Sequence, residues 1–303
     1  MSPDLATGAT VDQLLRDAAG RLAGAGVASA RADAEQLAAH VLAVPRGELL
    51  AAAVRGDRVD PAQAEQFEQL LVRRVAREPL QHLTGVADFR RIELGVGPGV
   101  FVPRPETEVL AGLAVDEASL VAGQGRADRP LVVDLCTGSG AVALAIADEV
   151  ARVRVVAVEL DPAALAWAAR NVHRLPAGRQ VELRRGDAAH ADTGVAADLT
   201  GQVDVLVANP PYIPAGARPV DPEVAQYDPP LALFGGGQDG LDLPRAVVAA
   251  AAGLLRPGGL LLMEHADVQG AATRALAGEE LWADVHTVAD LSGRDRVLSA
   301  RRR

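Results

Sequence analysis

The residues best suited to chemistry form the tetrapeptide Asn209-Pro210-Pro211-Tyr212. It follows residues 203–208, an apolar and largely β-branched run that predicts a buried strand, and the two prolines prevent this strand from continuing. The chain therefore turns sharply at the carboxyl end of the strand, where open α/β sheets bind their ligands. A side-chain amide, a rigid corner and an aromatic ring in this order can hold a flat, conjugated amino group.

This corner is suited to methyl transfer onto nitrogen. The lone pair of an amide or exocyclic amine is delocalised, so the nitrogen is a poor nucleophile. The Asn209 side-chain oxygen and the Pro210 carbonyl can accept its two N–H bonds, which orients the lone pair and stabilises the positive charge that develops. Tyr212 can pack against the planar group. We therefore predict Asn209, Pro210 and Tyr212 as catalytic residues, and the same residues with Pro211 as substrate-binding.

Three successive strand ends predict the methyl donor. Asp134 lies at the end of the strand 131–135 and precedes a glycine turn, where a carboxylate would repel a pyrophosphate but suits a cationic ligand. Glu159 ends the next strand and can accept both hydroxyls of a ribose. Asp187 ends the third and can meet an adenine edge, with Ala188 against the ring. S-adenosylmethionine fits all three features, whereas NAD fits only the ribose acid. The predicted cofactor-binding residues are Asp134, Cys136, Thr137, Gly138, Ser139, Gly140, Glu159, Asp187, Ala188 and Asn209.

The elements that would position these residues divide the chain into three parts. Residues 1–83 look helical, with a capping box at Thr10 and Gln13 and a helix start at Asp60-Pro61. Residues 84–105 predict a β-hairpin linker that turns around the glycines of 95–99. Residues 106–303 alternate strands with helices, so we expect a Rossmann-like α/β domain. The helical part is either a docking module for a partner or a cap on the catalytic domain.

A stiffened loop, Pro103-Arg104-Pro105-Glu106-Thr107-Glu108, precedes a helix predicted near 106–122. Arg104 and Glu106 on this loop can act as a substrate clamp. The alternative is a plain helix start, in which acidic residues of the first turn interact favourably with the helix dipole. The residues alone favour neither interpretation.

Composition restricts the class of protein. The chain of 303 residues has a formal net charge of −10, which argues against tight nonspecific binding to nucleic acid. One cysteine excludes an internal disulfide framework and a multi-cysteine metal site, and we expect no metal. No leader segment and no run of about 18 apolar residues is found, so we expect a soluble, cytoplasmic protein without membrane contact.

The Asn-Pro-Pro-Tyr corner resembles the signature of amino-methyltransferases that act on adenine in DNA, guanine in rRNA or glutamine in protein. Further stretches are similar to the peptide-chain release factor glutamine methyltransferases, the PrmC/HemK family, and the likeness covers nearly the whole chain. These stretches are Glu78-Pro79-Leu80-Gln81-His82-Leu83-Thr84-Gly85, Phe101-Val102-Pro103-Arg104-Pro105-Glu106-Thr107-Glu108 and Glu264-His265.

The resemblance implies a class I methyltransferase domain, with a mostly parallel seven-stranded sheet and an antiparallel last strand, preceded by a small all-α domain. It implies N5-methylation of the glutamine in the Gly-Gly-Gln motif of bacterial class I release factors, with S-adenosylmethionine as donor. It also implies a helical domain that helps to grip the factor. We further expect a monomer and, from the net charge, no direct nucleic-acid binding. The alternative is a DNA or rRNA amino-methyltransferase with the same corner. Two positions depart from the family: Cys136 replaces a common glycine, and Ala188 replaces a common aromatic residue.

Overall fold

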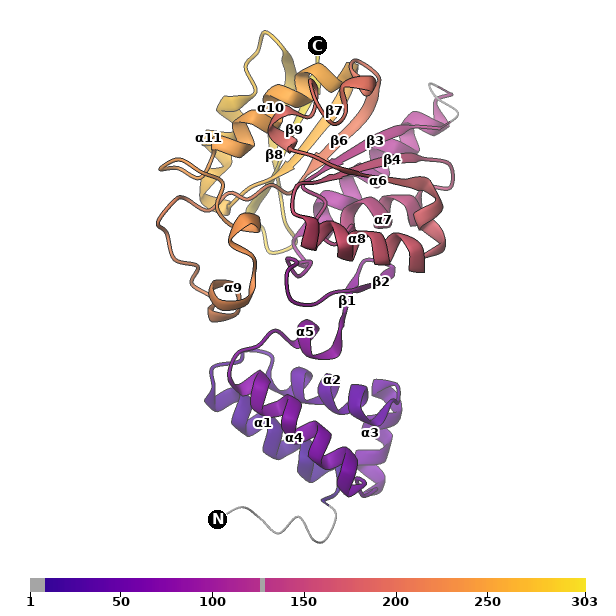
Figure 1. Ribbon diagram of the computed structural model, residues 1–303, viewed down its shortest axis with the longest axis vertical. Helices are drawn as coiled ribbons and strands as arrows, with labels where there is room; N and C mark the ends of the chain where they lie inside the picture. The colour runs from indigo at the N-terminus through magenta and orange to yellow at the C-terminus, as the bar shows by residue number, and fades with distance from the viewer. Residues whose placement is uncertain (1–8, 126–128) are drawn as a thin grey trace. The chain divides into compact units, whose positions relative to one another are not determined.

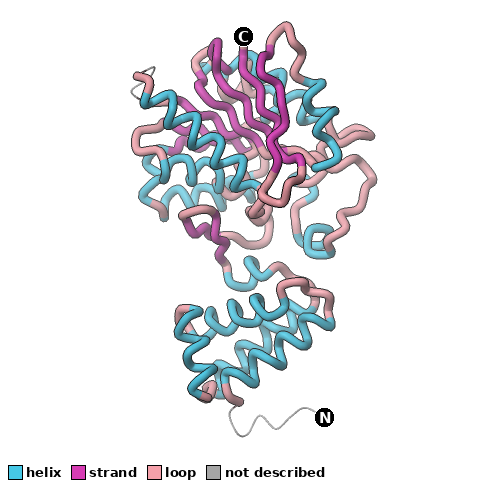
Figure 2. Tube along the Cα trace, turned by 180° about the vertical axis from the view of Figure 1, so that it is seen from behind, coloured by secondary structure: helices cyan, strands magenta, loops and turns pink. Residues whose placement is uncertain are grey.

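The computed structural model of the protein describes residues 9–125 and 129–303. The chain forms two compact units (Figure 1). Unit 1 contains the described residues up to Gly85 together with Val220–Tyr227, and unit 2 contains Val86–Pro219 and Asp228–Arg303. Unit 1 is built from helices alone, whereas the strands gather in unit 2 (Figure 2).

Unit 1 is a small bundle with its own apolar core. Its helices are α1 (Val11–Gly24), α2 (Ala30–Leu42), α3 (Arg46–Arg55), α4 (Pro61–Val75), α5 (Leu80–Thr84) and α9 (Pro222–Tyr227). Thr10 and Gln13 form the predicted capping box, and the Asp60 side chain accepts the N–H of Ala62 at the start of α4, so both predicted helix starts are confirmed. The core is built from buried Leu15, Leu22, Leu37, Leu49, Phe67 and Leu71.

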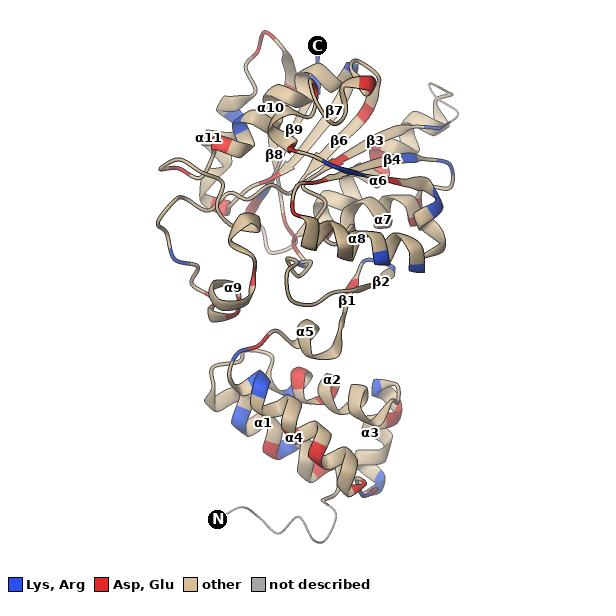
Figure 3. Ribbon diagram, in the orientation of Figure 1, with Lys and Arg blue, Asp and Glu red and all other residues tan. Residues whose placement is uncertain are grey.

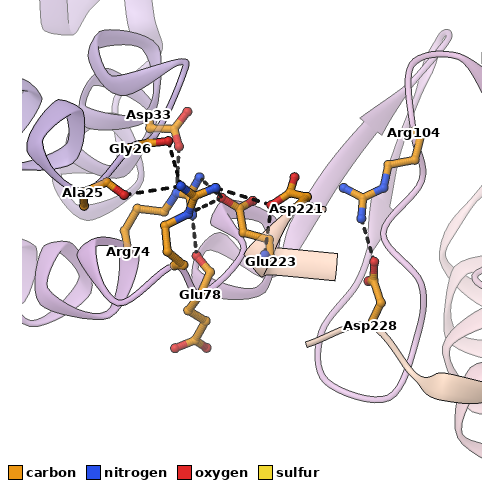
Figure 4. Close-up of polar contacts among 10 residues, drawn as sticks. Ala25, Gly26, Asp33, Arg74, Glu78, Arg104, Asp221, Glu223 and Asp228 are labelled. Atoms are coloured by element: carbon orange, nitrogen blue, oxygen red, sulfur yellow. Dashed lines mark hydrogen bonds and ion pairs between the residues drawn. The ribbon is translucent and has the colours of Figure 1, made fainter. Parts of the chain in front are cut away.

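A buried arginine lies at the polar centre of unit 1. Arg74 is only 3% exposed, and its Nε donates to the Asp33 carboxylate at 2.7 Å. Its Nη1 donates to the Glu78 carbonyl at 3.0 Å, and its Nη2 donates to Glu223 of α9 at 2.7 Å (Figure 4). Asp33 is 4% exposed, so the carboxylate depends on this guanidinium for its compensating charge.

A second arginine holds the same short helix. Arg77 approaches Glu223 at 2.9 Å and Asp221 at 3.4 Å, and its Nη1 donates to the Gly26 carbonyl at 2.7 Å. The α9 segment therefore joins the helical bundle through charge, although it lies in the long loop that follows the Asn-Pro-Pro-Tyr corner. The sequence pattern carried no sign of this placement.

The β-hairpin differs from its predicted form. It consists of β1 (Val86–Phe89) and β2 (Ile92–Gly95), with Phe89 paired to Ile92, so the turn lies at Arg90 and not at residues 95–99. Arg90 has a left-handed φ of 52°. Its N–H donates to Glu108 at 3.1 Å and its guanidinium pairs with Glu149. Long-range contacts therefore hold a non-glycine residue in the turn, and the glycines of 95–99 form the loop that follows.

Unit 2 is organised around one sheet with the strand order β5-β4-β3-β6-β7-β9-β8. The strands from β3 to β7 run parallel, and β9 is antiparallel to both β7 and β8. The predicted mostly parallel, seven-stranded sheet with an antiparallel last strand is therefore confirmed. The strands are β3 (Leu131–Leu135), β4 (Arg154–Glu159), β5 (Val181–Arg185), β6 (Val203–Ala208), β7 (Leu255–Glu264), β8 (Trp282–Ala289) and β9 (Asp295–Arg302).

Helices cover both faces of this sheet (Figure 1). One face packs against α6 (Thr107–Gly123), α7 (Ala141–Glu149) and α8 (Pro162–Arg174), and the other against α10 (Asp242–Leu254) and α11 (Gly270–Leu276). Because both faces are covered, the central strands are apolar throughout, which is why their sequences read as continuous runs. Short 3₁₀ helices complete the unit: η1 (Pro176–Gln180), η2 (Ala188–His190), η3 (Ala197–Leu199), η4 (Pro230–Ala232) and η5 (Asp267–Gln269).

Arginines and acidic residues both occur on each of α1 to α4, the four longer helices of unit 1 (Figure 3). Within the described residues, no group of three or more His, Cys, Asp or Glu side chains is placed to hold a metal ion. No single described helix is long and apolar enough to cross a membrane. The pair α2 and α3 passes that test of length and composition only when taken together, and it is bent by 95°.

Candidate active site

The parallel strands bring the predicted site residues to one edge of the sheet. Because β3 to β7 run in the same direction, the polar residues at their carboxyl ends form a row in the order Asp187, Glu159, Asp134, Asn209 and Glu264. The chain continues from β3 to β4 on one side, whereas β6 lies on the other side of β3. This reversal of strand order is the point at which doubly wound sheets bind ligands.

The glycine turn after β3 exposes its backbone because several of its residues adopt left-handed conformations. Gly138 has φ 59° and Gly140 has φ 84°, which glycine adopts without steric cost. The Gly138 N–H donates to Glu159 Oε2 at 2.8 Å, so the turn is tied to the neighbouring strand end. Cys136 also has a left-handed φ, 63°, a conformation that favours glycine and is uncommon for a residue with a side chain.

Asp134 is a buried carboxylate with little compensation. It is 1% exposed and accepts a hydrogen bond from the Thr137 hydroxyl at 2.5 Å. Burial raises the pKa of Asp134 to about 7, against the opposing effects of this hydroxyl and of the Ala143 N–H. A negative charge that is costly in the free protein favours a cationic ligand, because a nearby positive charge would stabilise the ionised form.

Glu159 is held by backbone N–H groups. Its Oε1 accepts from Leu160 and Asp161, both at 2.9 Å, while Oε2 accepts from Gly138. Burial raises the pKa of Glu159, and these hydrogen bonds oppose the shift. The side chain is therefore fixed beside the glycine turn before any ligand binds.

The third strand end is more open. The Asp187 carboxylate accepts the N–H of Ala189 at 2.9 Å and lies 3.4 Å from His190, with its side chain 48% exposed. Ala188 is buried, at 5% exposure. Both residues lie at the edge with Glu159, as predicted, and Asp187 also begins the short helix η2.

The Asn209 side chain has a defined orientation. Its Nδ2 donates to the Thr107 hydroxyl at 3.2 Å, so Oδ1 points away from Thr107. No described residue donates a hydrogen bond to Oδ1. Pro210 and Pro211 are both buried and fix the backbone after the strand. The corner therefore presents a free amide oxygen at the carboxyl end of β6.

Tyr212 is held at both its ring and its backbone. Its hydroxyl donates to Glu264 Oε1 at 3.4 Å, and burial, followed by the Glu264 charge, raises the pKa of Tyr212 well above its ordinary value. Gln269 Nε2 donates to the Tyr212 and Asp239 carbonyls, each at 2.9 Å. Sequence reasoning missed the contributions of Thr107, Glu264 and Gln269. A carboxylate at a strand end was a usable signal for Glu264, since Asp134 and Glu159 had been recognised on the same ground.

Arg104 and Glu106 lie in different surroundings. Arg104 pairs with the buried Asp228 at 2.7 Å (Figure 4), and its guanidinium lies over the Phe101 ring, 4.9 Å from the ring centre. Its charge is therefore compensated within unit 2. Glu106 is exposed and directly precedes α6, where its side chain makes no capping hydrogen bond.

Comparison with known proteins agrees with this geometry. Residues 13–85 match the family model described as the PrmC N-terminal domain, and residues 132–215 match the model of a methyltransferase domain. A release factor glutamine methyltransferase of Streptomyces coelicolor is 50% identical, with 93% of this chain and 94% of that protein covered. One of Mycolicibacterium smegmatis is 47% identical, with 93% and 94% covered. A 4-amino-L-phenylalanine/4-methylamino-L-phenylalanine methyltransferase of Streptomyces pristinaespiralis is 41% identical, with 88% and 87% covered.

These relatives match nearly the whole chain, and the matched models cover most of the helical bundle and the part of the sheet from β3 to the Asn-Pro-Pro-Tyr corner after β6. The predicted resemblance is thereby confirmed. The chain belongs to the release factor glutamine methyltransferase family, and it is an S-adenosylmethionine-dependent methyltransferase.

Proposed function

We propose that this protein methylates N5 of the glutamine in the Gly-Gly-Gln motif of bacterial class I release factors. The observation that carries the proposal is the Asn209 amide, whose nitrogen is engaged by Thr107 and whose oxygen is left free at the switch point of the sheet. A free, oriented amide oxygen matches the N–H of a primary carboxamide. The identity of the relatives supplies the substrate class.

The residues present fit S-adenosylmethionine. Asp134 would face its cationic amino acid part, the left-handed glycines would allow backbone approach, and Glu159 would accept the ribose hydroxyls. Ala188, with Asp187 beside it, would flank the adenine, although alanine offers no ring for stacking. When bound, S-adenosylmethionine supplies an electrophilic methyl group.

The corner acts on the glutamine amide of the acceptor. Asn209 Oδ1 accepts one N–H and the Pro210 carbonyl accepts the other, so the nitrogen lone pair is held perpendicular to both contacts. These acceptors stabilise the positive charge that develops on the nitrogen. No base is needed beforehand, because the N–H becomes acidic only as the nitrogen is alkylated. Tyr212, fixed by Glu264 and Gln269, packs against the planar amide.

Replacing Glu159 by alanine is expected to weaken S-adenosylmethionine binding by about 10- to 100-fold, because a charged acceptor of two hydroxyls is removed. Isothermal titration calorimetry measures this affinity directly. Glu182→Ala is the matched control, since Glu182 lies on the neighbouring strand and pairs at the surface with Arg154 at 2.9 Å. Unchanged affinity in Glu159→Ala would show that the ribose assignment is wrong.

Cofactor affinity is expected to depend on pH through Asp134. The pKa of Asp134 is about 7 in the free protein, so below pH 7 a proton must leave before the carboxylate can pair with a cation. Affinity should then fall by up to about tenfold for each pH unit below 7 and level off above it. Calorimetry across this range tests the slope. Asp134→Asn should bind weakly with a flattened slope, and an equally steep slope in that variant would assign the dependence to another group.

The helical unit is proposed to dock the release factor. The matched N-terminal family model covers residues 13–85, and unit 1 has its own core and its own network of ion pairs. Its charges of both signs suit a protein surface better than a phosphate backbone (Figure 3). This argument also ranks DNA and rRNA below a protein acceptor.

One relative points to a second candidate acceptor. The 41% identical methyltransferase named for 4-amino-L-phenylalanine and its methylamino form suggests that this scaffold can also serve an aryl amine. Such an acceptor also has a delocalised nitrogen lone pair and N–H donors, so the Asn209 corner would serve it equally. Its small size would leave the helical unit without a docking role.

The test compares two release factors that differ at one residue, the glutamine of Gly-Gly-Gln and the same position changed to glutamate. We expect methyl transfer to the first and none to the second. Equal labelling of both would place the methyl group elsewhere on the factor. Transfer to 4-amino-L-phenylalanine with none to either factor would establish the second candidate.

A further inference from the structure

We propose that Thr107 and Glu264 are positioning residues that fix the orientation of the Asn209 amide for the acceptor. This inference rests on the proposed function, because it explains how the Asn209 oxygen comes to face an amide N–H. It gives a task to the buried Thr107 and a second task to Glu264, which also holds Tyr212, and it places both outside the groups that touch the acceptor.

The three side chains meet because of the sheet register. Ala208 pairs with Met263 between β6 and β7, so the next residues, Asn209 and Glu264, lie side by side at the ends of neighbouring parallel strands. Thr107 reaches the same place from the first turn of α6, 102 positions earlier in the chain than Asn209. Thr107 is 4% exposed and Glu264 is 3% exposed, so water does not replace these contacts.

The Thr107 hydroxyl bonds the Asn209 amide and lies close enough to Glu264 to act on its pKa. It accepts from Asn209 Nδ2 at 3.2 Å, so its own proton must be donated elsewhere. Of the neighbours that lower the pKa of Glu264, this hydroxyl has the largest effect. An ionised carboxylate can only accept hydrogen bonds, so its charge favours a hydroxyl proton turned toward Glu264 and leaves the hydroxyl lone pairs for the amide nitrogen.

This arrangement decides which atom of Asn209 faces the acceptor. With Nδ2 bound to Thr107, Oδ1 is left for the N–H of the glutamine amide. A rotated side chain would present NH₂ to NH₂, so that donors would face donors and the acceptor amide would lose its orientation. The orientation is set before substrate binds, which avoids reorganisation during the reaction.

The protonation state of Glu264 can control the contact between Thr107 and Asn209. Its Oε1 accepts from Tyr212, and Oε2 has no hydrogen-bond partner among the described residues. Burial raises the pKa of Glu264 to about 7, with Thr107, Arg296 and Tyr212 lowering it and Glu106 raising it. When protonated, Glu264 can itself donate to the Thr107 hydroxyl. The hydroxyl then no longer has to turn its lone pairs toward Asn209 Nδ2, and the orientation of the amide is no longer fixed. The kcat at saturating S-adenosylmethionine should therefore fall as the pH drops through about 7.

The test begins with Thr107→Val, which keeps the shape and removes the hydroxyl. We expect kcat to fall about 10- to 30-fold, less than for loss of Asn209 itself, with KM for the release factor and cofactor affinity nearly unchanged. Thr107→Ser should recover most of the rate, since it restores the hydroxyl. Thr273→Val is the matched control, because the buried Thr273 hydroxyl bonds only the carbonyls of Gln269 and Gly270.

Two further measurements separate positioning from a general structural role. The double variant Thr107→Val/Asn209→Ala should have the same kcat as Asn209→Ala alone, because Thr107 acts only through Asn209. Glu264→Gln should lower kcat and abolish the fall in kcat near pH 7, measured at saturating S-adenosylmethionine so that the Asp134 effect on cofactor affinity does not contribute. Additive losses in the double variant, or a Thr107→Val rate equal to the wild type, would overturn the proposal.

A readout without any acceptor keeps this proposal distinct from the proposed function. The side-chain amide signals of Asn209, assigned in NMR spectra by their absence from Asn209→Ala, should titrate near pH 7 in the wild type and not in Glu264→Gln. If release factor is not methylated but these signals titrate as expected, the substrate is wrong and the positioning role stands. If the factor is methylated but the Asn209 signals are the same in the wild type and in the Thr107 and Glu264 variants, the positioning role is wrong and the proposed function stands.

Discussion

Replacing Asn209 by alanine is expected to lower kcat by about 10²–10³ while leaving the affinity for S-adenosylmethionine nearly intact. The side chain lies at the end of β6, on the side of β3 opposite Glu159, and it is bound to Thr107 through its nitrogen. Its oxygen is the preorganised acceptor for one N–H of the glutamine. Loss of that contact removes stabilisation that grows as positive charge develops on the acceptor nitrogen.

Quantitative methyl transfer at saturating concentrations of both substrates measures this effect, and calorimetry checks the cofactor. Gln202→Ala is a suitable control, because that amide bonds the Asp198 carbonyl at 2.9 Å at the surface of the same unit. A variant with the wild-type kcat would remove Asn209 from the mechanism. A large loss of cofactor affinity would instead assign it to donor binding.

Replacing Arg74 by methionine is expected to destabilise unit 1 by about 3–5 kcal/mol. The guanidinium compensates buried Asp33 and also holds Glu223 of α9, at 2.7 Å in each case. Methionine fills much of the same space but leaves Asp33 without its charged partner, whereas Glu223 keeps Arg77 at 2.9 Å. The cost comes mainly from the uncompensated charge of Asp33, because burial prevents water from taking over.

Two optical signals distinguish the units during denaturation. Trp167 and Trp282, the only tryptophans, both lie in unit 2, so their fluorescence follows that unit, whereas far-ultraviolet circular dichroism also follows the helices of unit 1. We expect the dichroism transition of Arg74→Met to move to lower denaturant and the fluorescence transition to move little.

Matched variants make the Arg74 result interpretable. Arg21→Met breaks a pair with Glu68 whose side chains are 42% and 50% exposed, and it should cost no more than about 1 kcal/mol. Asp33→Asn added to Arg74→Met should recover part of the loss by removing the stranded charge. Equal effects of Arg74→Met and Arg21→Met would contradict the role given to burial.

The strands and the cofactor edge could be predicted because both depend on local sequence. Continuous apolar runs identify strands that are covered on both faces, and parallel strands necessarily bring their carboxyl ends to one edge. Asp134, Glu159, Asp187 and Asn209 could therefore be placed together before the structure was known. Their roles toward the cofactor and the acceptor remain predictions that the variants above test.

The hairpin turn could not be predicted, because it depends on distant partners. An arginine at φ 52° is unusual, and the glycines nearby could form a turn with less steric strain. The contacts of Arg90 with Glu108 and Glu149 decide the register, and both carboxylates come from helices that follow later in the chain. A local pattern contains no information about them.

Dependence on distant partners also explains why the contacts around the Asn-Pro-Pro-Tyr corner could not be predicted. Thr107 stands in a stretch that was interpreted as a clamp or a helix start, and its contact with Asn209 spans 102 positions. The proposed clamp residue Arg104 is instead paired with Asp228, 124 positions away. Ion pairs likewise bring α9 into the helical unit. Charged and hydroxyl side chains reveal their partners only in the folded chain.

The most direct test of the central claim is one labelled-methyl transfer assay with separate acceptors: a bacterial class I release factor, unmethylated duplex DNA and 4-amino-L-phenylalanine. Mass spectrometry of the labelled protein locates the methyl group. Our account predicts label on the glutamine of Gly-Gly-Gln, none on DNA, and loss of that label with Asn209→Ala. Label on DNA or on the aryl amine with none on the release factor would contradict it.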